Sequence, residues 1–409
     1  MRGLEARARE VLDRRLLKDS AAPIAIALSG GGDSLALTLI ADAWARAAGR
    51  PLLILTVDHG LQAQSAAWTA TCAAVAARLG RPFQPLRWVG EKPVTGLPAA
   101  ARRARHAELA EAARAAGARV VLMGHTADDL AEAAAMRRAG STTPDPREWA
   151  PSPVWPEGRG VFVLRPLLRL GRGELRAWLQ ARGEAWIEDP ANADPRYARG
   201  RARLAGVTLA PRLEDAAPLE LAQDAVERAG MLSLDRTALR RADPAEMLRL
   251  AALACVCAGG GERPPAGTRV ARLAKRLRAD APWVGSLAGA RIEADDGQVR
   301  FIREAGEAAR GGLRPTALGA DGAVVWDGRF ELTAPGPGRE LRALAGLAGR
   351  LPRDQQAALK TLPPAARRGL PAIVGSDGGV DCPALTGAAT SLVLARLRAA
   401  AGLVRSEPA

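Results

Sequence analysis

The chain is long and strongly basic: among its 409 residues, 58 Lys and Arg outnumber 44 Asp and Glu, for a formal charge of +14. This length exceeds what one hydrophobic core normally serves, so two or three domains are expected. The four cysteines form no C-x-x-C pair and lie away from the histidines, which argues against zinc and iron–sulfur sites.

Almost all of the positive charge is arginine. The planar guanidinium fork suits phosphate oxygens, so a nucleic-acid partner is one interpretation. The other interpretation is that the arginine content reflects codon bias and a need for solubility. The N-terminal pattern MRGLEARAREVLDRRLL spreads its charges along an amphipathic helix, which argues against a signal peptide, and no long uncharged apolar run predicts a membrane span. We therefore expect a cytoplasmic protein with reduced, buried cysteines and no membrane partner.

Four short apolar runs alternate with longer helical patterns from Pro23 onward. The runs are Ile24–Leu28, Leu52–Val57, Phe83–Trp88 and Arg119–Gly124. This alternation predicts an α/β domain with a parallel sheet and helices on both faces. Ligands of such a domain bind at the carboxyl ends of the strands.

The pattern changes twice further along the chain. The Pro-rich stretch Ser141–Gly160 predicts a long loop without regular structure, before a helix near Gly171–Arg182. From about Thr208 the segments EMLRLAALACVCA and RVARLAKRLRAD predict helices, and the D-G within Val324–Thr333 predicts a β-hairpin. We therefore expect an N-terminal catalytic domain over 1–207, a helical domain over 208–318 and a small α+β or β-rich domain over 319–409.

The first strand runs directly into SGGGDS, residues 29–34, and a helical pattern follows at once. Consecutive glycines let backbone N–H groups turn toward an anion, and the helix N-terminus adds a partial positive charge. The motif lacks the lysine of a Walker A loop and does not fit G-x-G-x-x-G. It predicts a phosphate or pyrophosphate site; the alternative is a turn in which Asp33 or Ser34 caps the helix. By contrast, Gly259–Gly261 follows a helical pattern and predicts only a turn.

Two other strands deliver polar residues to the same sheet edge. The second strand ends in VDHGL, which contains Asp58 and His59. The fourth ends in GHTADDLAE, whose acidic residues share one helical face and suit either Mg²⁺ or an amine. The alternative is that these acids only favour the helix N-terminus.

The segment AARRARHAEL places Arg102 and Arg105 three residues apart on one helical face. A solvated basic face is one interpretation of this pair. The other is that at least one arginine neutralises charge in a phosphoryl-type transition state.

Together these motifs resemble the tRNA(Ile)-lysidine synthetase family of PP-loop ATP pyrophosphatases. In chain order the matching segments are SGGGDS, VDHGL, ARRAR, GHTADD, RPLL and WIEDPANADPRYARGRAR. The last segment discriminates best, because other PP-loop enzymes lack it. The chain departs from the family pattern at several positions, among them His106, where tyrosine is usual.

The resemblance implies a ligase that forms a C–N bond. Its substrates are ATP, L-lysine and the isoleucine tRNA with a CAU anticodon, whose wobble cytidine is adenylated at its C2 oxygen before the lysine ε-amine displaces AMP. The two C-terminal domains are expected to bind tRNA. The oligomeric state stays open, with a homodimer as one option.

The resemblance also assigns roles to single residues. Nucleotide binding falls to Ser29, Gly30, Gly31, Gly32, Asp33, Ser34, Asp58 and His59. Mg²⁺ is assigned to Asp33 and Asp129. Catalytic roles fall to Asp33, Arg102, Arg105, His125, Asp129 and Glu132, and tRNA binding to Arg199, Arg201 and Arg203.

Three alternatives remain at this point. A tRNA thiolase on the same fold would need catalytic cysteines. GMP or NAD synthetases would need a glutaminase domain or a different C-terminal half. An arginine-rich RNA-binding protein without activity would not need Asp33 or the Asp128–Asp129 pair.

Overall fold

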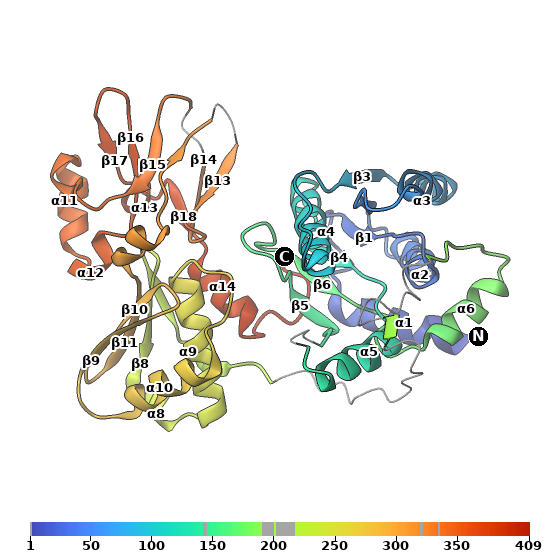
Figure 1. The fold of residues 1–409 in the computed structure, drawn as a ribbon, viewed down its shortest axis with the longest axis horizontal. Helices are drawn as coiled ribbons and strands as arrows, with labels where there is room; N and C mark the ends of the chain where they lie inside the picture. Colours follow the sequence, from blue (N-terminus) through green and yellow to red (C-terminus); the bar gives the residue numbers. More distant parts are fainter. Residues whose placement is uncertain (1, 142–144, 190–199, 202–216, 320–321, 334–335) are drawn as a thin grey trace. The chain divides into compact units, whose positions relative to one another are not determined.

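The computed structural model describes residues 2–141, 145–189, 200–201, 217–319, 322–333 and 336–409. The chain divides into two compact units, shown in Figure 1. The first is formed by Met1–Ala216 with Val404–Ala409, and the second by Ala217–Leu403. The finer division at residues 207 and 318 stays a prediction.

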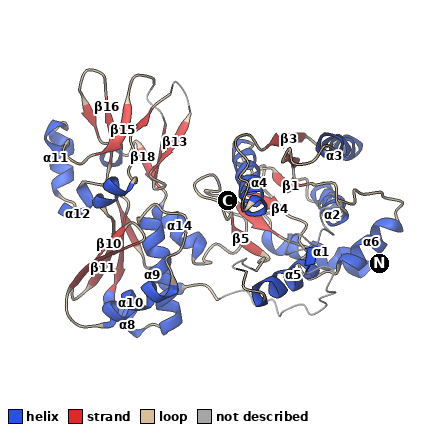
Figure 2. Ribbon diagram, viewed as in Figure 1, coloured by secondary structure: helices blue, strands red, loops and turns tan. Residues whose placement is uncertain are grey.

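Helices and strands alternate along the first unit (Figure 2). Its elements are α1 (Arg2–Arg15), β1 (Ile24–Ala27), α2 (Gly32–Ala47), β2 (Leu52–Asp58), α3 (Ser65–Leu79), β3 (Phe83–Arg87), α4 (Leu97–Ala115), β4 (Val120–Leu122), α5 (Ala127–Arg138), β5 (Trp149–Pro151), β6 (Phe162–Leu164) and α6 (Arg172–Gln180). All four strands predicted from the apolar runs are confirmed, as is the helix near Gly171.

The first unit is built on a six-stranded sheet of order β3-β2-β1-β4-β6-β5. The pairs β1/β2, β2/β3, β1/β4 and β4/β6 are all parallel. The chain therefore winds outward from β1 in both directions, and the loops after β1 and β4 leave the sheet side by side. A crevice between such neighbouring loops is the usual ligand site of an open parallel sheet.

Alternate residues of the strands pack on opposite faces of this sheet. On one face Ile24 and Ile26 join a core with α1, α2, α3 and α6. On the other, Ala25 and Val121 pack with α4 through residues such as Leu109. Both faces are covered, as the near-continuous apolar strands predict.

The prediction that Ser141–Gly160 lacks regular structure is wrong for β5. This strand pairs antiparallel with β6, so that Trp149 lies opposite Leu164. The Trp149 ring stacks on Phe162 at a centroid distance of 4.9 Å. A strand containing Pro151 is possible here because β5 lies at the sheet edge, where the missing N–H breaks no ladder.

The second unit carries the remaining elements. They are a 3-10 turn η2 (Glu220–Ala222), β7 (Val226–Arg228), β8 (Met231–Asp235), α8 (Arg236–Arg241), α9 (Pro244–Ala258), α10 (Gly267–Arg278), β9 (Trp283–Leu287), β10 (Ala290–Ala294), β11 (Gln298–Arg303), η3 (Ala305–Arg310), β12 (Thr316–Ala317), β13 (Ala323–Trp326), β14 (Phe330–Thr333), β15 (Glu340–Ala343), η4 (Ala348–Arg350), α11 (Arg353–Lys360), α12 (Pro364–Arg367), β16 (Pro371–Val374), β17 (Val380–Asp381), α13 (Pro383–Thr386), β18 (Ala389–Ser391) and α14 (Val393–Ala400).

Three antiparallel sheets organise this unit. The first has the order β7-β8-β11-β10-β9 and shares a core with α9, α10 and α14. The others, β12-β15-β16-β17 and β13-β14-β18, share a second core. The helices α9 and α10 are confirmed, but the description of this region as helical is incomplete because it missed the five-stranded sheet.

The hairpin predicted at D-G is also confirmed. It joins β13 to β14 through Asp327 and Gly328, whose φ angles are 51° and 64°. Positive φ at both central positions is typical of the tight turn that matches strand twist. In the described part of the chain, no helix is long and apolar enough to cross a membrane.

The last residues of the chain pack within the first unit. Val404 accepts a hydrogen bond from Nε1 of Trp149 at 2.7 Å, and the Glu407 amide donates to the Arg15 carbonyl at 2.7 Å. The Glu407 carboxylate forms an ion pair with Arg50 at 2.8 Å. The C-terminal segment is thus part of the first unit.

Candidate active site

The phosphate loop lies between β1 and α2. Gly31 is the residue before the helix, and Gly30 has a φ of +83°, in the left-handed region that favours glycine. The Ser34 hydroxyl donates to the Gly31 carbonyl at 2.8 Å. The same hydroxyl accepts from the Ser29 amide at 3.2 Å and lies 3.1 Å from the Ser29 hydroxyl. The two serines therefore hold the loop in shape.

Backbone amides of this loop are open to a ligand. Among the described residues, no group accepts a hydrogen bond from the amides of Gly30, Gly31 or Gly32. These amides precede or begin α2, where the helix dipole adds a partial positive charge. The loop consequently has the donors and the field of an anion site, as the sequence predicts.

The discriminating WIED segment lies against the phosphate loop. The Ile187 amide donates to the Gly30 carbonyl at 2.9 Å. A Cβ added at Gly30 would lie 2.4 Å from Cδ1 of Ile187, and one added at Gly32 would lie 3.4 Å from the Trp186 ring. These glycines therefore also permit close packing by the segment. Of its arginines, Arg201 is exposed, while Arg199 and Arg203 lie outside the described residues.

The loop after β4 also meets the phosphate loop. A Cβ at Gly124 would lie 3.0 Å from the carbonyl carbon and oxygen of Asp33 and from Cα of Ser34. A Cβ would be crowded against this backbone, so glycine favours the close approach of the two loops. The GHTADD and SGGGDS motifs, distant in sequence, are thus held in direct contact.

The acids of α5 divide into distinct roles. Oδ2 of Asp129 accepts from the Thr126 amide at 2.7 Å and from its hydroxyl at 3.0 Å, so Asp129 closes a capping box. Asp128 accepts from the Arg172 amide at 2.7 Å and so joins α5 to α6. Glu132 is buried one turn further along α5. Asp129 therefore does stabilise the helix N-terminus, as the alternative interpretation predicts. Its other oxygen, Oδ1, lies 3.8 Å from Nη2 of Arg172.

Arg172 is a site residue that the sequence analysis missed. Its Nε donates to Asp33 Oδ2 at 3.1 Å, and its Nη1 donates to Glu132 Oε1 at 3.1 Å. The side chain thereby connects the phosphate loop with α5. Burial raises the pKa of the Asp33 carboxyl, and the charge of Arg172 acts in the opposite direction. Burial would lower the pKa of Arg172, but the surrounding carboxylates prevail and raise it.

A buried basic cluster adjoins these acids. Nε of Arg165 donates to Nδ1 of His125 at 3.1 Å, and burial, with the charge of Arg102, lowers the pKa of Arg165 to about 9. Because Nδ1 of His125 accepts, its Nε2 carries the proton of the neutral ring. Burial and then Arg105 lower the pKa of His106, which is therefore a neutral packing residue.

Asp58 and His59 follow β2 at the predicted sheet edge. The Asp58 carboxylate accepts from the Gly60 amide at 2.7 Å. Burial, followed by the charge of Arg105, lowers the pKa of His59 to about 4. At neutral pH this ring is uncharged and offers a nucleotide hydrogen bonding or stacking only.

All four cysteines are free and buried, as predicted. Burial raises the pKa of Cys72, and it raises those of Cys255 and Cys257 to about 12 and about 11. Cys72 lies beneath the phosphate loop and directs its thiol to the Leu28 carbonyl at 3.7 Å. None of these three is poised as the thiolate that a thiolase needs.

The site was also tested for its fit to Mg²⁺. In the described ranges, no group of three or more His, Cys, Asp and Glu residues is arranged to hold a metal by itself. Mg²⁺ usually takes only one or two carboxylates together with substrate phosphates and water. Asp33, at the start of α2, fits this mode; Asp129 fits it less well because one of its oxygens serves the cap.

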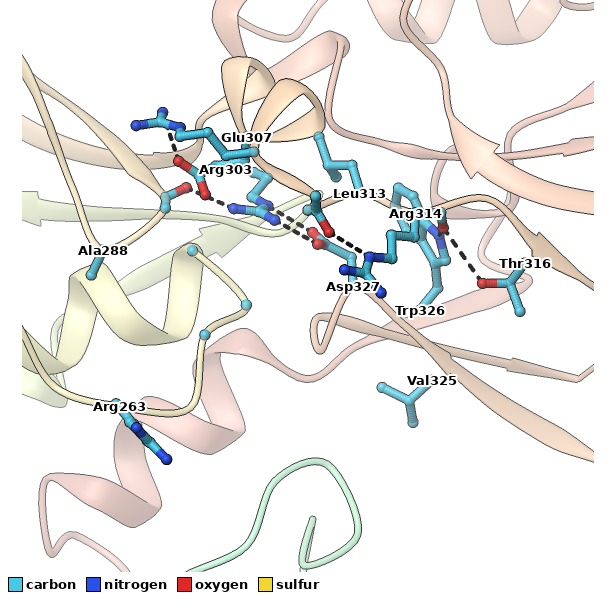
Figure 3. Close-up of a pocket in the computed structure, with 17 residues that line it drawn as sticks. Arg263, Ala288, Arg303, Glu307, Leu313, Arg314, Thr316, Val325, Trp326 and Asp327 are labelled. Atoms are coloured by element: carbon cyan, nitrogen blue, oxygen red, sulfur yellow. Dashed lines mark hydrogen bonds and ion pairs between the residues drawn. The ribbon is translucent and has the colours of Figure 1, made fainter. Parts of the chain in front are cut away.

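A pocket away from the phosphate loop lies within the second unit (Figure 3). It has a volume of about 680 Å³ and is bordered by Gly259–Gly261, Arg263 and Arg314. On its wall, Arg303 binds both carboxylate oxygens of Asp327, at 2.7 and 2.8 Å. A Cβ at Gly260 would lie 2.0 Å from the Asp327 carbonyl oxygen, so the triple glycine allows a close backbone approach after α9.

Comparison with known proteins agrees with this geometry. A family model described as a PP-loop domain matches residues 4–208. The tRNA(Ile)-lysidine synthase of Caulobacter vibrioides is 52% identical over 377 residues, which cover 92% of this chain and 89% of that protein. The chain belongs to the tRNA(Ile)-lysidine synthase family. The resemblance seen in the sequence is therefore confirmed, with its α/β PP-loop fold and its assignment as a ligase that uses ATP in tRNA modification.

Two further members of the lysidine synthase family extend the match. The Hyphomonas neptunium enzyme is 37% identical and covers 66% of this chain and 79% of its own length. The Rhizobium meliloti enzyme is 36% identical, with coverages of 83% and 80%. The roles of single residues stay predictions.

Proposed function

We propose that this chain joins L-lysine to C2 of the wobble cytidine in the CAU anticodon of tRNA(Ile). The C2 oxygen attacks the α-phosphorus of ATP and releases pyrophosphate. The ε-amine of lysine then attacks C2, loses a proton and displaces AMP. We assign the reaction to the cytoplasm, because tRNA, ATP and L-lysine are all present there.

The observation that carries this proposal is the open phosphate loop beside an acidic helix. The amides of Gly30, Gly31 and Gly32 have no described acceptor and are suited to the β- and γ-phosphates. Pyrophosphate is a good leaving group when such donors stabilise its developing charge. The acids of α5 are joined to this loop through Arg172.

We assign Asp33 to Mg²⁺, which neutralises phosphate charge when bound. Arg102 and Arg105 on α4 are assigned to the phosphates or the activated base, for which guanidinium groups are suited. His125, whose Nδ1 accepts from Arg165, is assigned to the lysine or the metal. Asp129 and Glu132 are assigned to the lysine amine, since carboxylates attract an ammonium group and Glu132 can accept its proton.

A basic face of α10 supports a tRNA-binding role for the second unit. The helix buries its apolar side through Val270, Leu273 and Leu277. On the other side Arg269, Arg272, Lys275 and Arg276 are exposed, and no described acid pairs with them. Such a row of cations matches a phosphate backbone. This face is the proposed tRNA contact surface of the second unit, and Arg201 is a separate proposed contact in the first unit.

Replacing Arg272 and Arg276 together by alanine is expected to weaken tRNA binding and to make its salt dependence shallower. Two lost phosphate contacts reduce the slope of log K against log salt by about 1 to 2. Filter binding over a salt series measures this change. Arg342→Ala is the control, because this exposed arginine already pairs with Glu340 at 3.3 Å. Equal slopes for wild type and the double variant would show that α10 does not face RNA.

The test of the proposed function is incorporation of labelled lysine into tRNA(Ile) transcripts. We expect label to depend on ATP, Mg²⁺ and the cytidine at the wobble position. A transcript with uridine at that position is the control. Sulfur incorporation instead of lysine would favour a thiolase, and tRNA binding without either product would favour an inactive RNA-binding protein.

A further inference from the structure

Arg172 occupies the centre of the acidic group at the phosphate loop. Nε and Nη1 lie 3.1 Å from oxygens of Asp33 and Glu132, respectively. Nη2 lies 3.8 Å from Oδ1 of Asp129, too far for a hydrogen bond. Nη2 is also buried without any hydrogen-bond acceptor. The guanidinium therefore donates to two of the three carboxylates, and its Nη2 has no acceptor among the described residues.

The backbone of Arg172 is anchored independently of its side chain. Its amide is held by Asp128 at 2.7 Å, at the first residue of α6. The side chain is 17% exposed and has several rotatable bonds. A change of rotamer would move the guanidinium without disturbing the helix.

The charges around Arg172 favour exchange with another cation. Three carboxylates, from Asp33, Asp129 and Glu132, surround one guanidinium. A primary ammonium group is smaller than the planar guanidinium fork and has three rotatable donors, so it can approach these oxygens more closely.

We propose that Arg172 is the positioning residue of this site: its guanidinium holds the three carboxylates together in the ligand-free chain and is displaced by the lysine ε-ammonium. This inference rests on the proposed function for the identity of the cation. The displacement makes entry of the ammonium group compete with an internal ion pair, so Arg172 lowers the affinity for lysine.

The test measures cation binding without nucleotide or tRNA. L-lysine binding is followed by calorimetry, with norleucine as the analogue that lacks the ε-amine, and Mn²⁺ binding is followed by electron paramagnetic resonance for comparison. We expect Arg172→Ala to bind lysine at least about tenfold more tightly than wild type, because the competing guanidinium charge is gone. Arg172→Lys should behave like wild type, since it restores a resident cation.

Arg176→Ala is the matched control. Arg176 lies one turn further along α6 and pairs with the exposed Glu188 at 2.9 Å, so its loss should leave both affinities unchanged. A gain for Mn²⁺ alone, or no gain for lysine in folded Arg172→Ala, would overturn the proposal.

A measurement on the wild-type enzyme covers the case in which Arg172→Ala does not fold. In crystals grown with lysine, Mg²⁺ and a non-hydrolysable ATP analogue, Nε of Arg172 should lie beyond hydrogen-bond distance of Asp33. A retained contact with all ligands bound would refute displacement. Neither readout depends on lysidine formation, so a failed lysine-incorporation assay would count against the proposed function alone.

Discussion

Asp33→Ala is expected to reduce tRNA-dependent ATP–pyrophosphate exchange by about 100-fold or more, the usual effect of removing one charge-stabilising group from an active site. Asp33 lies in the first turn of α2, directly after the open amides, and is the carboxylate that we assign to Mg²⁺. The variant should still bind tRNA, because Asp33 is not among the residues that we propose to contact tRNA. Exchange of labelled pyrophosphate into ATP measures the loss.

Two variants control this experiment. Asp33→Asn keeps the side-chain volume and should lose nearly as much exchange as alanine, since the charge is absent in both. Glu174→Ala removes an acid from the first turn of α6, where it accepts from the Gly171 amide at 3.1 Å, and should cost only about 1 kcal/mol of stability. Unchanged exchange in Asp33→Ala would contradict the assignment of the phosphate loop.

Glu407→Ala is expected to lower the stability of the first unit by about 3 to 5 kcal/mol, the usual cost of leaving a buried charge without its partner. The side chains of Arg50 and Glu407 are 0% and 1% exposed, and their carboxylate–guanidinium contacts are 2.8 and 3.1 Å. Glu407 also accepts from the Leu17 amide at 2.9 Å. Thermal unfolding should show a decrease in Tm of roughly 10 °C.

The double variant Arg50→Met with Glu407→Leu distinguishes the cost of an unpaired charge from loss of the C-terminal segment. Replacing both partners by apolar side chains should restore most of the stability. Ser406→Ala, next to Glu407, should unfold like wild type. A Tm of Glu407→Ala within about 2 °C of wild type would show that the ion pair contributes little.

The catalytic fold was predictable because its signals are local. Apolar runs such as Ile24–Leu28 alternate with helical patterns, and this order alone predicts a parallel sheet. The phosphate loop is contiguous in sequence, so its glycines and the following helix could be read together. The loops after β2 and β4 reach the same edge for a topological reason, since parallel strands share their carboxyl end.

Other features lie beyond local pattern. β5 contains Pro151, and its pairing with β6 depends on a sheet edge that no local sequence reveals. The strands β8 to β11 were missed next to strong helical patterns because their pairing joins separate segments, and strand preference depends on context.

The amino-acid sequence by itself determined the α/β class, the phosphate loop, the acidic helix and the family, because each depends on residues close together in the chain. Only the tertiary structure decided that Arg172 lies among Asp33, Asp129 and Glu132, and that Glu407 neutralises Arg50. These ion pairs join residues far apart in sequence, and an arginine-rich chain offers many candidates for each. Burial selects among them, since a charge removed from water must lie against a particular partner.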